Sequence, residues 1–168
     1  MLSQSSRDAT DLDLRPLAKG ILHNIGVIIV GLGVGLIGSD IDRLAGLHDF
    51  RSPAPTVAGC ALLLAGFLLR VWATFHFYKN GMRVISLSPQ RTLITSGPYR
   101  FSRNPLYLGG NVFIFLGTAL LFGSPAAVII TFVHLPLVDL LIRREEKQLE
   151  SNFGEKWRQY RRRARRWL

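Results

Sequence analysis

Residues 106–142 read LYLGGNVFIFLGTALLFGSPAAVIITFVHLPLVDLLI, two apolar runs joined by Phe122-Gly123-Ser124-Pro125. The few polar interruptions are Asn111 and Thr118 in the first run and Thr131, His134 and Asp139 in the second. A membrane-spanning helix needs about 20 predominantly apolar residues, with about 17 as the lower limit. The short, turn-forming connection therefore predicts a helical hairpin whose two free ends lie side by side on one face of a membrane.

Two further apolar blocks precede this hairpin, at about residues 17–38 and 56–78. All four blocks are apolar on every side, whereas a helix of a soluble domain keeps a polar face. A chain of 168 residues has too little polar surface to cover four such helices. The sequence thus predicts an all-α integral membrane protein with four transmembrane helices, at about 17–38, 56–78, 105–122 and 125–142. Residues 1–168 form a single domain, with a polar N-terminal segment at 1–16 and a cytoplasmic helix and basic tail at 143–168.

The charge of the chain indicates its orientation. The sequence holds 21 Lys and Arg against 11 Asp and Glu, a formal net charge of +10. With four spans, 18 of the 21 basic residues fall on the side that carries both termini and the middle loop. The positive-inside rule places that side in the cytoplasm, next to anionic lipid headgroups, so the charge requires no nucleic-acid partner. A single cysteine, Cys60, excludes a disulfide framework or a cysteine-based zinc site, and we expect no metal.

The segment that enters the hairpin, residues 91–109, reads RTLITSGPYRFSRNPLYLG. Asn104-Pro105 is typical of an N-cap followed by proline at the first helical position. Such a helix start favours a ligand carboxylate or phosphate, and Tyr99 and Tyr107 add flat surfaces that suit an aromatic base. The structural alternative is a well-capped helix with interfacial aromatic residues.

The segment that leaves the hairpin carries the acidic pair Glu145 and Glu146 among many cations. Acidic groups so close to a bilayer need partners. One interpretation is a structural ion-pair network with Arg103, Arg143 or Arg144. The functional interpretation is that one of the two carboxylates binds the hydroxyls or ammonium of a polar ligand.

Residues 97–109 (GPYRFSRNPLYLG), the Arg143-Arg144-Glu145-Glu146 tetrapeptide and residues 153–160 (FGEKWRQY), in this order, resemble the isoprenylcysteine carboxyl methyltransferase and phospholipid methyltransferase superfamily. The resemblance extends upstream to residues 69–73 (LRVWA) and covers the chain from about residue 66 to its end. It implies an integral membrane enzyme that uses S-adenosyl-L-methionine, and the likeness to short bacterial members implies a bacterial inner membrane.

Carried over by position, the resemblance implies cofactor contacts in the two segments described above. They fall on Arg91, Thr92, Leu93, Ile94, Tyr99, Asn104, Pro105, Leu106, Tyr107 and Glu145. Many relatives have histidine at the position of Asn104, and an asparagine side chain can bond but cannot titrate. The eukaryotic prenylcysteine enzymes place an arginine near the substrate carboxylate at a position occupied here by Leu141, which weakens an argument for the same substrate.

Methyl transfer from a sulfonium needs alignment and exclusion of water, and the acceptor determines whether a base is needed. A carboxylate acceptor needs none, whereas an amine or hydroxyl needs one or must arrive deprotonated. The candidate catalytic residues are Glu146 and Asp139, with Arg143 beside Asp139 and His134 as a further candidate base. Pairing with Arg143 is the structural alternative for Asp139.

The resemblance favours a lipophilic acceptor held in the membrane, either a carboxylate-bearing isoprenoid thioether or a phospholipid amine. The alternative class is a membrane scaffold or lipid-binding protein that kept the hairpin without catalysis. Arg70, within the second block, is expected to face inward as a structural partner or a contact of the substrate headgroup. Five glycines are expected to let helices pack closely: Gly31, Gly33 and Gly35 in the first block, and Gly59 and Gly66 in the second. Oligomeric state has no signature in the sequence.

Overall fold

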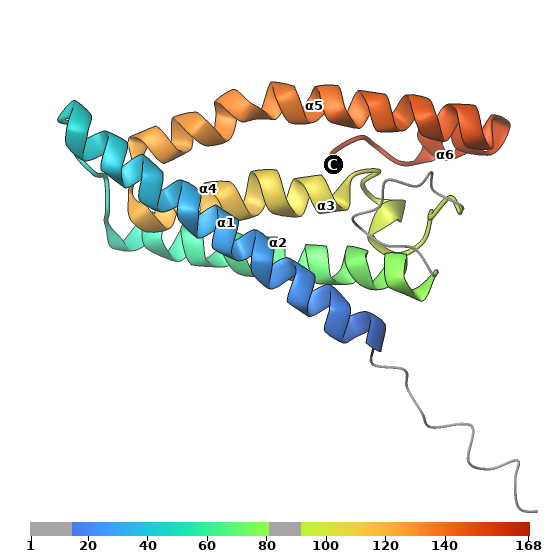
Figure 1. Ribbon diagram of the computed structural model, residues 1–168, viewed down its shortest axis with the longest axis horizontal. Helices are drawn as coiled ribbons and strands as arrows, with labels where there is room; N and C mark the ends of the chain where they lie inside the picture. The colour runs from blue at the N-terminus through green and yellow to red at the C-terminus, as the bar shows by residue number, and fades with distance from the viewer. Residues whose placement is uncertain (1–14, 81–91) are drawn as a thin grey trace, which may run out of the picture.

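The computed structural model describes residues 15–80 and 92–168, and these ranges form helices with no β-strand (Figure 1). Four helical stretches are long and apolar enough to cross a membrane: Ile21–Ala45, Pro53–Lys79, Pro105–Phe122 and Pro125–Phe153. The predicted fold class, an all-α protein with four transmembrane helices, is therefore confirmed.

The hairpin lies at the centre of the bundle. The elements in chain order are α1 (Arg15–Ala45), α2 (Pro53–Lys79), the 3₁₀-helix η1 (Gly97–Arg100), α3 (Pro105–Tyr107), the π-helix η2 (Leu108–Ile114), α4 (Phe115–Phe122), α5 (Pro125–Phe153) and α6 (Glu155–Arg163). Figure 1 shows the continuous helix α3–η2–α4 between α2 and α5, while α1 crosses the bundle diagonally and packs on α2, α4 and α5. Both ends of the hairpin thus reach the same end of the bundle.

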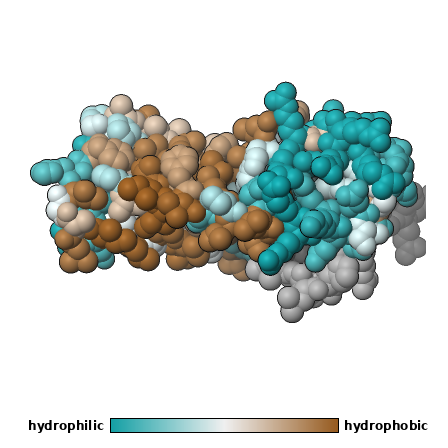
Figure 2. Space-filling model, turned by 90° about the horizontal axis from the view of Figure 1, so that it is seen from above, coloured by the Kyte–Doolittle hydropathy of each residue, from teal (hydrophilic) through white to brown (hydrophobic). Residues whose placement is uncertain are grey.

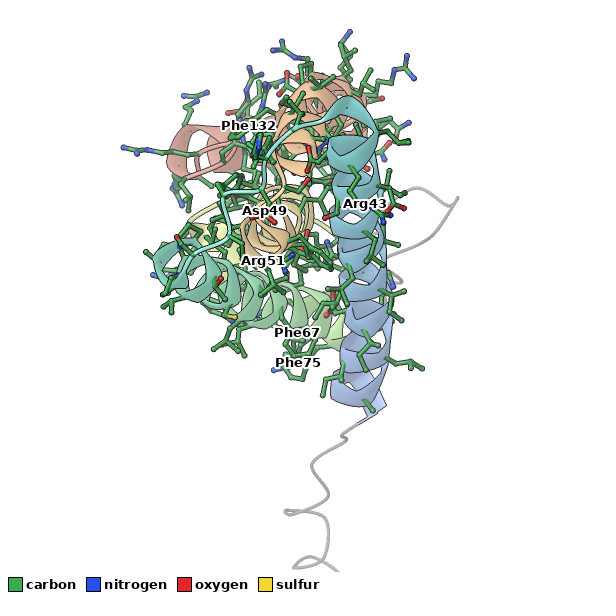
Figure 3. The ribbon with its side chains drawn as sticks, turned by 90° about the vertical axis from the view of Figure 1, so that its left-hand side faces the viewer. Arg43, Asp49, Arg51, Phe67, Phe75 and Phe132 are labelled. Carbon is green, nitrogen blue, oxygen red and sulfur yellow. The ribbon has the colours of Figure 1, made fainter. Side chains whose placement is uncertain are left out.

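The connection between α4 and α5 is the tight turn that its sequence predicts. Gly123 adopts φ +61°, a left-handed conformation that glycine tolerates best. The Ser124 hydroxyl caps α5 by accepting a hydrogen bond from the Ala127 N–H at 3.0 Å. Figure 3 views the bundle from this end and shows Asp49 and Arg51 lying across it. Arg51 donates to the Phe122 carbonyl at 3.1 Å, which closes this end of the hairpin.

Helix α1 extends seven residues beyond the boundary predicted at residue 38, because a carboxylate in the extension has a structural task. Asp42 is buried and accepts hydrogen bonds from the Ser124 hydroxyl at 2.5 Å and the Ala126 N–H at 2.9 Å. These bonds tie α1 to the start of α5. The sequence prediction ended the helix where the apolar residues end. It could not show that Asp42, beyond that point, would be buried as the hydrogen-bond partner of the start of α5.

Helix α5 also passes the boundary predicted at residue 142 and continues to Phe153. Gly154, at φ +51°, ends it and starts α6, so the predicted C-terminal helix is divided between the last turns of α5 and α6. Gly154 provides the backbone freedom that this sharp break needs.

The surface agrees with a position in a bilayer. Figure 2 shows apolar residues over the middle of the molecule and hydrophilic residues at the end where α6 lies. Leu22, Val57 and Val133 are each about two thirds exposed or more, which suits lipid contact and not water. We call the end formed by η1, α3, the last turns of α5 and α6 the polar end.

Candidate active site

A pocket lies at the polar end, between the segment that enters the hairpin and the segment that leaves it. Its hollow measures about 500 Å³, counted with the space at its mouth that is open to solvent. The lining residues are Phe77, Leu93, Ile94, Tyr99, Arg103, Asn104, Pro105, Leu106, Tyr107, Glu145, Leu149, Trp157 and Tyr160.

The back wall of the pocket is aromatic. Gly97, at φ +61°, starts η1 against the His76 ring with no room for a side chain, and η1 therefore sits tightly on the end of α2. Its Tyr99 ring lies 5.7 Å from the Phe77 ring, and the Tyr160 hydroxyl donates to the Tyr99 carbonyl at 2.8 Å. Helix α6 thus locks the η1 turn in place and presents rings that suit an aromatic base.

The front of the pocket holds a carboxylate. The Tyr107 hydroxyl donates to Glu145 Oε1 at 2.6 Å, joining α3 to α5 across the hairpin. A hydrogen bond this short to a carboxylate is of the strong, charge-assisted kind. The carboxylate keeps acceptor capacity for the hydroxyls or ammonium of a ligand.

Three buried donors that belong to lining residues have no hydrogen-bond partner within the described residues: Tyr99 Oη, Arg103 Nε and Trp157 Nε1. Tyr99 is 6% exposed and Trp157 is 1% exposed. Burial raises the pKa of Tyr99 well above its usual range, so the hydroxyl keeps its proton and acts as a donor. Buried polar groups in native proteins are nearly always satisfied, and all three of these donors belong to residues that line one hollow.

Glu146 lies in different surroundings from its neighbour. It is 8% exposed and forms ion pairs with Arg103 at 3.2 Å and Arg166 at 2.7 Å. Arg166 also pairs with Asp139 at 3.2 Å, and Asp139 pairs with Arg143 at 2.6 Å. The hydrogen bond between Arg166 and Glu146 raises the pKa of Arg166. These acidic and basic groups form a continuous network beside the pocket.

The C-terminal segment after α6 returns to the start of the hairpin. The Arg103 N–H donates to the Arg165 carbonyl at 2.8 Å, and the Asn104 side-chain amide donates to the Arg166 carbonyl at 3.0 Å. Asn104 precedes α3 as predicted, but its side chain makes no capping bond. The Asn104 side chain instead bonds to the C-terminal segment, which stabilises the part of the chain that lines the pocket.

The structure brings together most of the residues that the resemblance assigned to the cofactor. Those that line the pocket are Leu93, Ile94, Tyr99, Asn104, Pro105, Leu106, Tyr107 and Glu145. Thr92 is exposed and is not among the lining residues, and Arg91 lies outside the described residues. The candidate catalytic residues Glu146, Asp139 and Arg143 lie in the ion-pair network and not in the pocket wall. The structural alternative for Asp139, an ion pair with Arg143, is present in the structure.

Sequence reasoning missed five lining residues: Phe77, Arg103, Leu149, Trp157 and Tyr160. Trp157 and Tyr160 are three residues apart in a short basic helix, a spacing that puts both rings on one face. That spacing could have predicted a buried face of α6. The neighbouring sequence, however, does not indicate which element this face packs against.

The fold and the site together define a polytopic helical membrane protein with a small-molecule pocket between the two ends of a transmembrane hairpin. The chain belongs to the phospholipid methyltransferase family, whose sequence model matches residues 55–156. Searches of curated proteins and of solved structures gave no match. The family confirms the resemblance drawn from residues 97–109 and makes the chain a membrane methyltransferase. The matched range begins within α2, so α1 lies outside it.

Proposed function

We propose that this protein transfers a methyl group from S-adenosyl-L-methionine to a lipophilic acceptor held in the membrane, and that the methylated group is a carboxylate. The observation that carries the proposal is the pocket at the polar end. It combines a carboxylate, a wall of aromatic rings and three buried donors without a partner among the described residues. The methyltransferase family of the chain supports the same conclusion.

The residues present fit this cofactor. The Tyr99 hydroxyl and the Trp157 N–H lack partners among the described residues, and a purine with a ribose offers acceptors for both. Glu145 suits the ammonium of the methionine portion or the ribose hydroxyls. The rings of Phe77, Tyr99, Trp157 and Tyr160 supply stacking surface.

When bound, the cofactor supplies a methyl carbon activated on a positively charged sulfur. The chain provides binding and orientation. Tyr107 fixes the Glu145 carboxylate, while Tyr160 fixes the turn that carries Tyr99. The buried aromatic wall excludes water from one side of the pocket, and the bilayer limits water on the other.

The ion-pair network favours a carboxylate acceptor. An amine acceptor has to lose a proton to a base. Glu146 and Asp139 are both held in ion pairs with arginines and neither lines the pocket, so neither is placed to accept that proton. A carboxylate acceptor needs no base. The second candidate is a phospholipid amine, which the description of the matching family favours.

We also infer that the polar end faces the cytoplasm of a bacterial inner membrane, next to anionic headgroups. The support is the distribution of charge, with 18 of 21 basic residues on the side of the termini and middle loop. In this orientation the pocket opens to the compartment where the soluble cofactor is made.

Methyl transfer can be followed with full-length protein in lipid nanodiscs, a lipid extract and cofactor carrying a labelled methyl group. We expect label in extractable lipid that mild base releases as methanol, because methyl esters hydrolyse and N-methyl groups do not. Base-stable label would support the amine acceptor. The absence of labelled lipid at every extract tested would contradict the proposed activity.

The Tyr99→Phe variant sharpens this experiment. The hydroxyl has no described protein partner, so its removal leaves the fold intact. Loss of a bond to the ligand is expected to lower kcat/KM for the cofactor about fivefold to tenfold, the effect of one ordinary hydrogen bond. Tyr78→Phe, in α2 and away from the pocket lining, is the matched control and should behave as wild type.

A further inference from the structure

Arg70 is a charged side chain inside a membrane-spanning helix. It lies in α2, nine residues before the end of the helix at Lys79, and is 7% exposed. Charged residues within a span are costly, usually face the interior of the bundle and commonly mark a functional site. The partners of this arginine therefore need an account.

The described partners of Arg70 are all neutral. Its Nε donates to Asn24 Oδ1 at 2.7 Å and its Nη1 to the Leu106 carbonyl at 2.5 Å. Its Nη2 lies 3.4 Å from His23 Nε2. Among residues 15–80 and 92–168, no carboxylate forms an ion pair with it. The positive charge is oriented by dipoles but has no counter-charge in the described protein.

The Arg70 side chain packs closely against the hairpin. A Cβ added to Gly110 would lie 2.7 Å from Nη1, and one added to Gly109 would lie 2.7 Å from Cγ of Arg70. Two adjacent glycines in η2 thus make room for the side chain. The bond to Leu106, a lining residue, places the charge immediately behind the pocket.

Among the described residues, the Nη2 atom of Arg70 makes only a long contact, to His23. The contact with His23 is long, and an imidazole and a guanidinium are both natural donors to an anion. His23 is half-buried and lies in the first third of α1. An oxygen of an anionic group placed between the two side chains would accept from both.

We propose that Arg70 and His23 bind an anionic group, a carboxylate or a phosphate, of the methyl acceptor and so select an anionic acceptor. The inference rests on the proposed methyl transfer, because it assigns a role in the acceptor site of that reaction. His23 lies on α1, outside the range that matches the family. The selection therefore belongs to this chain and not to the matched region alone.

Quenching of Trp72 by brominated lipids tests this proposal. Trp72 is 45% exposed and lies two residues from Arg70. Full-length protein in phosphatidylcholine nanodiscs is titrated with dibromostearic acid, dibromo-phosphatidic acid or dibromo-diacylglycerol, and a Trp72→Phe sample supplies the background. The first two probes separate a carboxylate from a phosphate, and the third is the neutral reference.

We expect half-maximal quenching by at least one anionic probe at a mole fraction about tenfold or more below that of diacylglycerol, as charged hydrogen bonds typically provide. Arg70→Gln should remove this preference and Arg70→Lys should keep part of it. His23→Leu should weaken it about threefold to tenfold. Arg162→Gln, an exposed charge on α6, is the control for surface electrostatics and should leave it unchanged.

Equal quenching by anionic and neutral probes in the wild type would overturn the proposal, as would an unchanged preference in folded Arg70→Gln. If Arg70→Gln does not fold, the half-buried His23→Leu decides, and full preference in that variant is the overturning result. Calorimetric binding of S-adenosyl-L-methionine to the same samples is read separately. Its absence in the wild type would sink the proposed function without altering the lipid result.

Discussion

Glu145 and Glu146 are neighbours on α5, yet their carboxylates have different surroundings. Consecutive residues on a helix point about 100° apart. Glu145 therefore meets Tyr107 in the pocket, while Glu146 meets Arg103 and Arg166 behind it. The first lines the pocket and the second holds the end of the chain.

A substitution of Arg166 tests the structural role of the Glu146 ion pairs. Its side chain is 24% exposed and bonds to both Glu146 and Asp139. Arg166→Ala should lower the free energy of unfolding by about 1.5–3 kcal/mol, the usual range for charged hydrogen bonds. Thermal unfolding in detergent, followed by circular dichroism, measures the change.

Arg165→Ala is the matched control for that variant. Its side chain is exposed, and the structure uses its backbone carbonyl, which the substitution keeps. Its melting temperature should stay within experimental error of wild type. Equal destabilisation by both variants would show that loss of positive charge, and not the Arg166 bonds, is responsible.

Asn104 shows where prediction at the residue level ends. Its position before Pro105 correctly predicted the start of a helix. Its side chain, however, bonds to the Arg166 carbonyl, 62 residues away. Local propensity identifies a cap position, but it cannot identify a competing partner brought there by the tertiary fold.

At the scale of elements, the fit between α2 and the hairpin depends on glycines. A Cβ on Gly59 would lie 2.7 Å from the Gly117 carbonyl oxygen, and one on Gly66 would lie 2.6 Å from the Gly109 carbonyl oxygen. Backbones this close leave no space for a methyl group. The predicted packing role of Gly59 and Gly66 is confirmed, but the same prediction for Gly33 is wrong, because a Cβ there would meet nothing within 4 Å.

Gly59→Ala should therefore force α2 and α4 apart. We expect a loss of roughly 1–3 kcal/mol of stability, as for overpacking in other cores, seen as a lower melting temperature in detergent. Gly33→Ala is the matched control, because a Cβ at Gly33 meets nothing within 4 Å. That variant should melt at or slightly above the wild-type temperature, since alanine favours helix. An unchanged melting temperature for Gly59→Ala would contradict the close packing.

The π-helix η2 was not predictable from the apolar pattern. Residues 108–114 read as part of a helix broken only by Asn111, and their hydropathy carries no sign of a wider turn. The structure places Gly109 and Gly110 in this segment, where the Arg70 side chain fits against them. Such wide turns are frequently associated with functional sites, and this one adjoins the pocket.

At the scale of the whole molecule, the sequence was sufficient for the four spans and for the meeting of the two hairpin ends. Hydropathy dominates membrane folds because every span must satisfy its backbone internally. The aromatic back wall of the pocket could not be predicted from hydropathy. Trp157 and Tyr160 reach the pocket only because Gly154 turns α6 back toward η1.

The most direct test of the account is calorimetric titration of S-adenosyl-L-methionine into the full-length protein in nanodiscs. We predict saturable binding to one site per chain, weakened about tenfold or more by Glu145→Gln, as expected for loss of a charged hydrogen bond. Glu150→Gln, in the same helix but outside the pocket lining, should bind like wild type. No binding by the wild type, or equal affinity of wild type and Glu145→Gln, would contradict the claim that this pocket holds the cofactor.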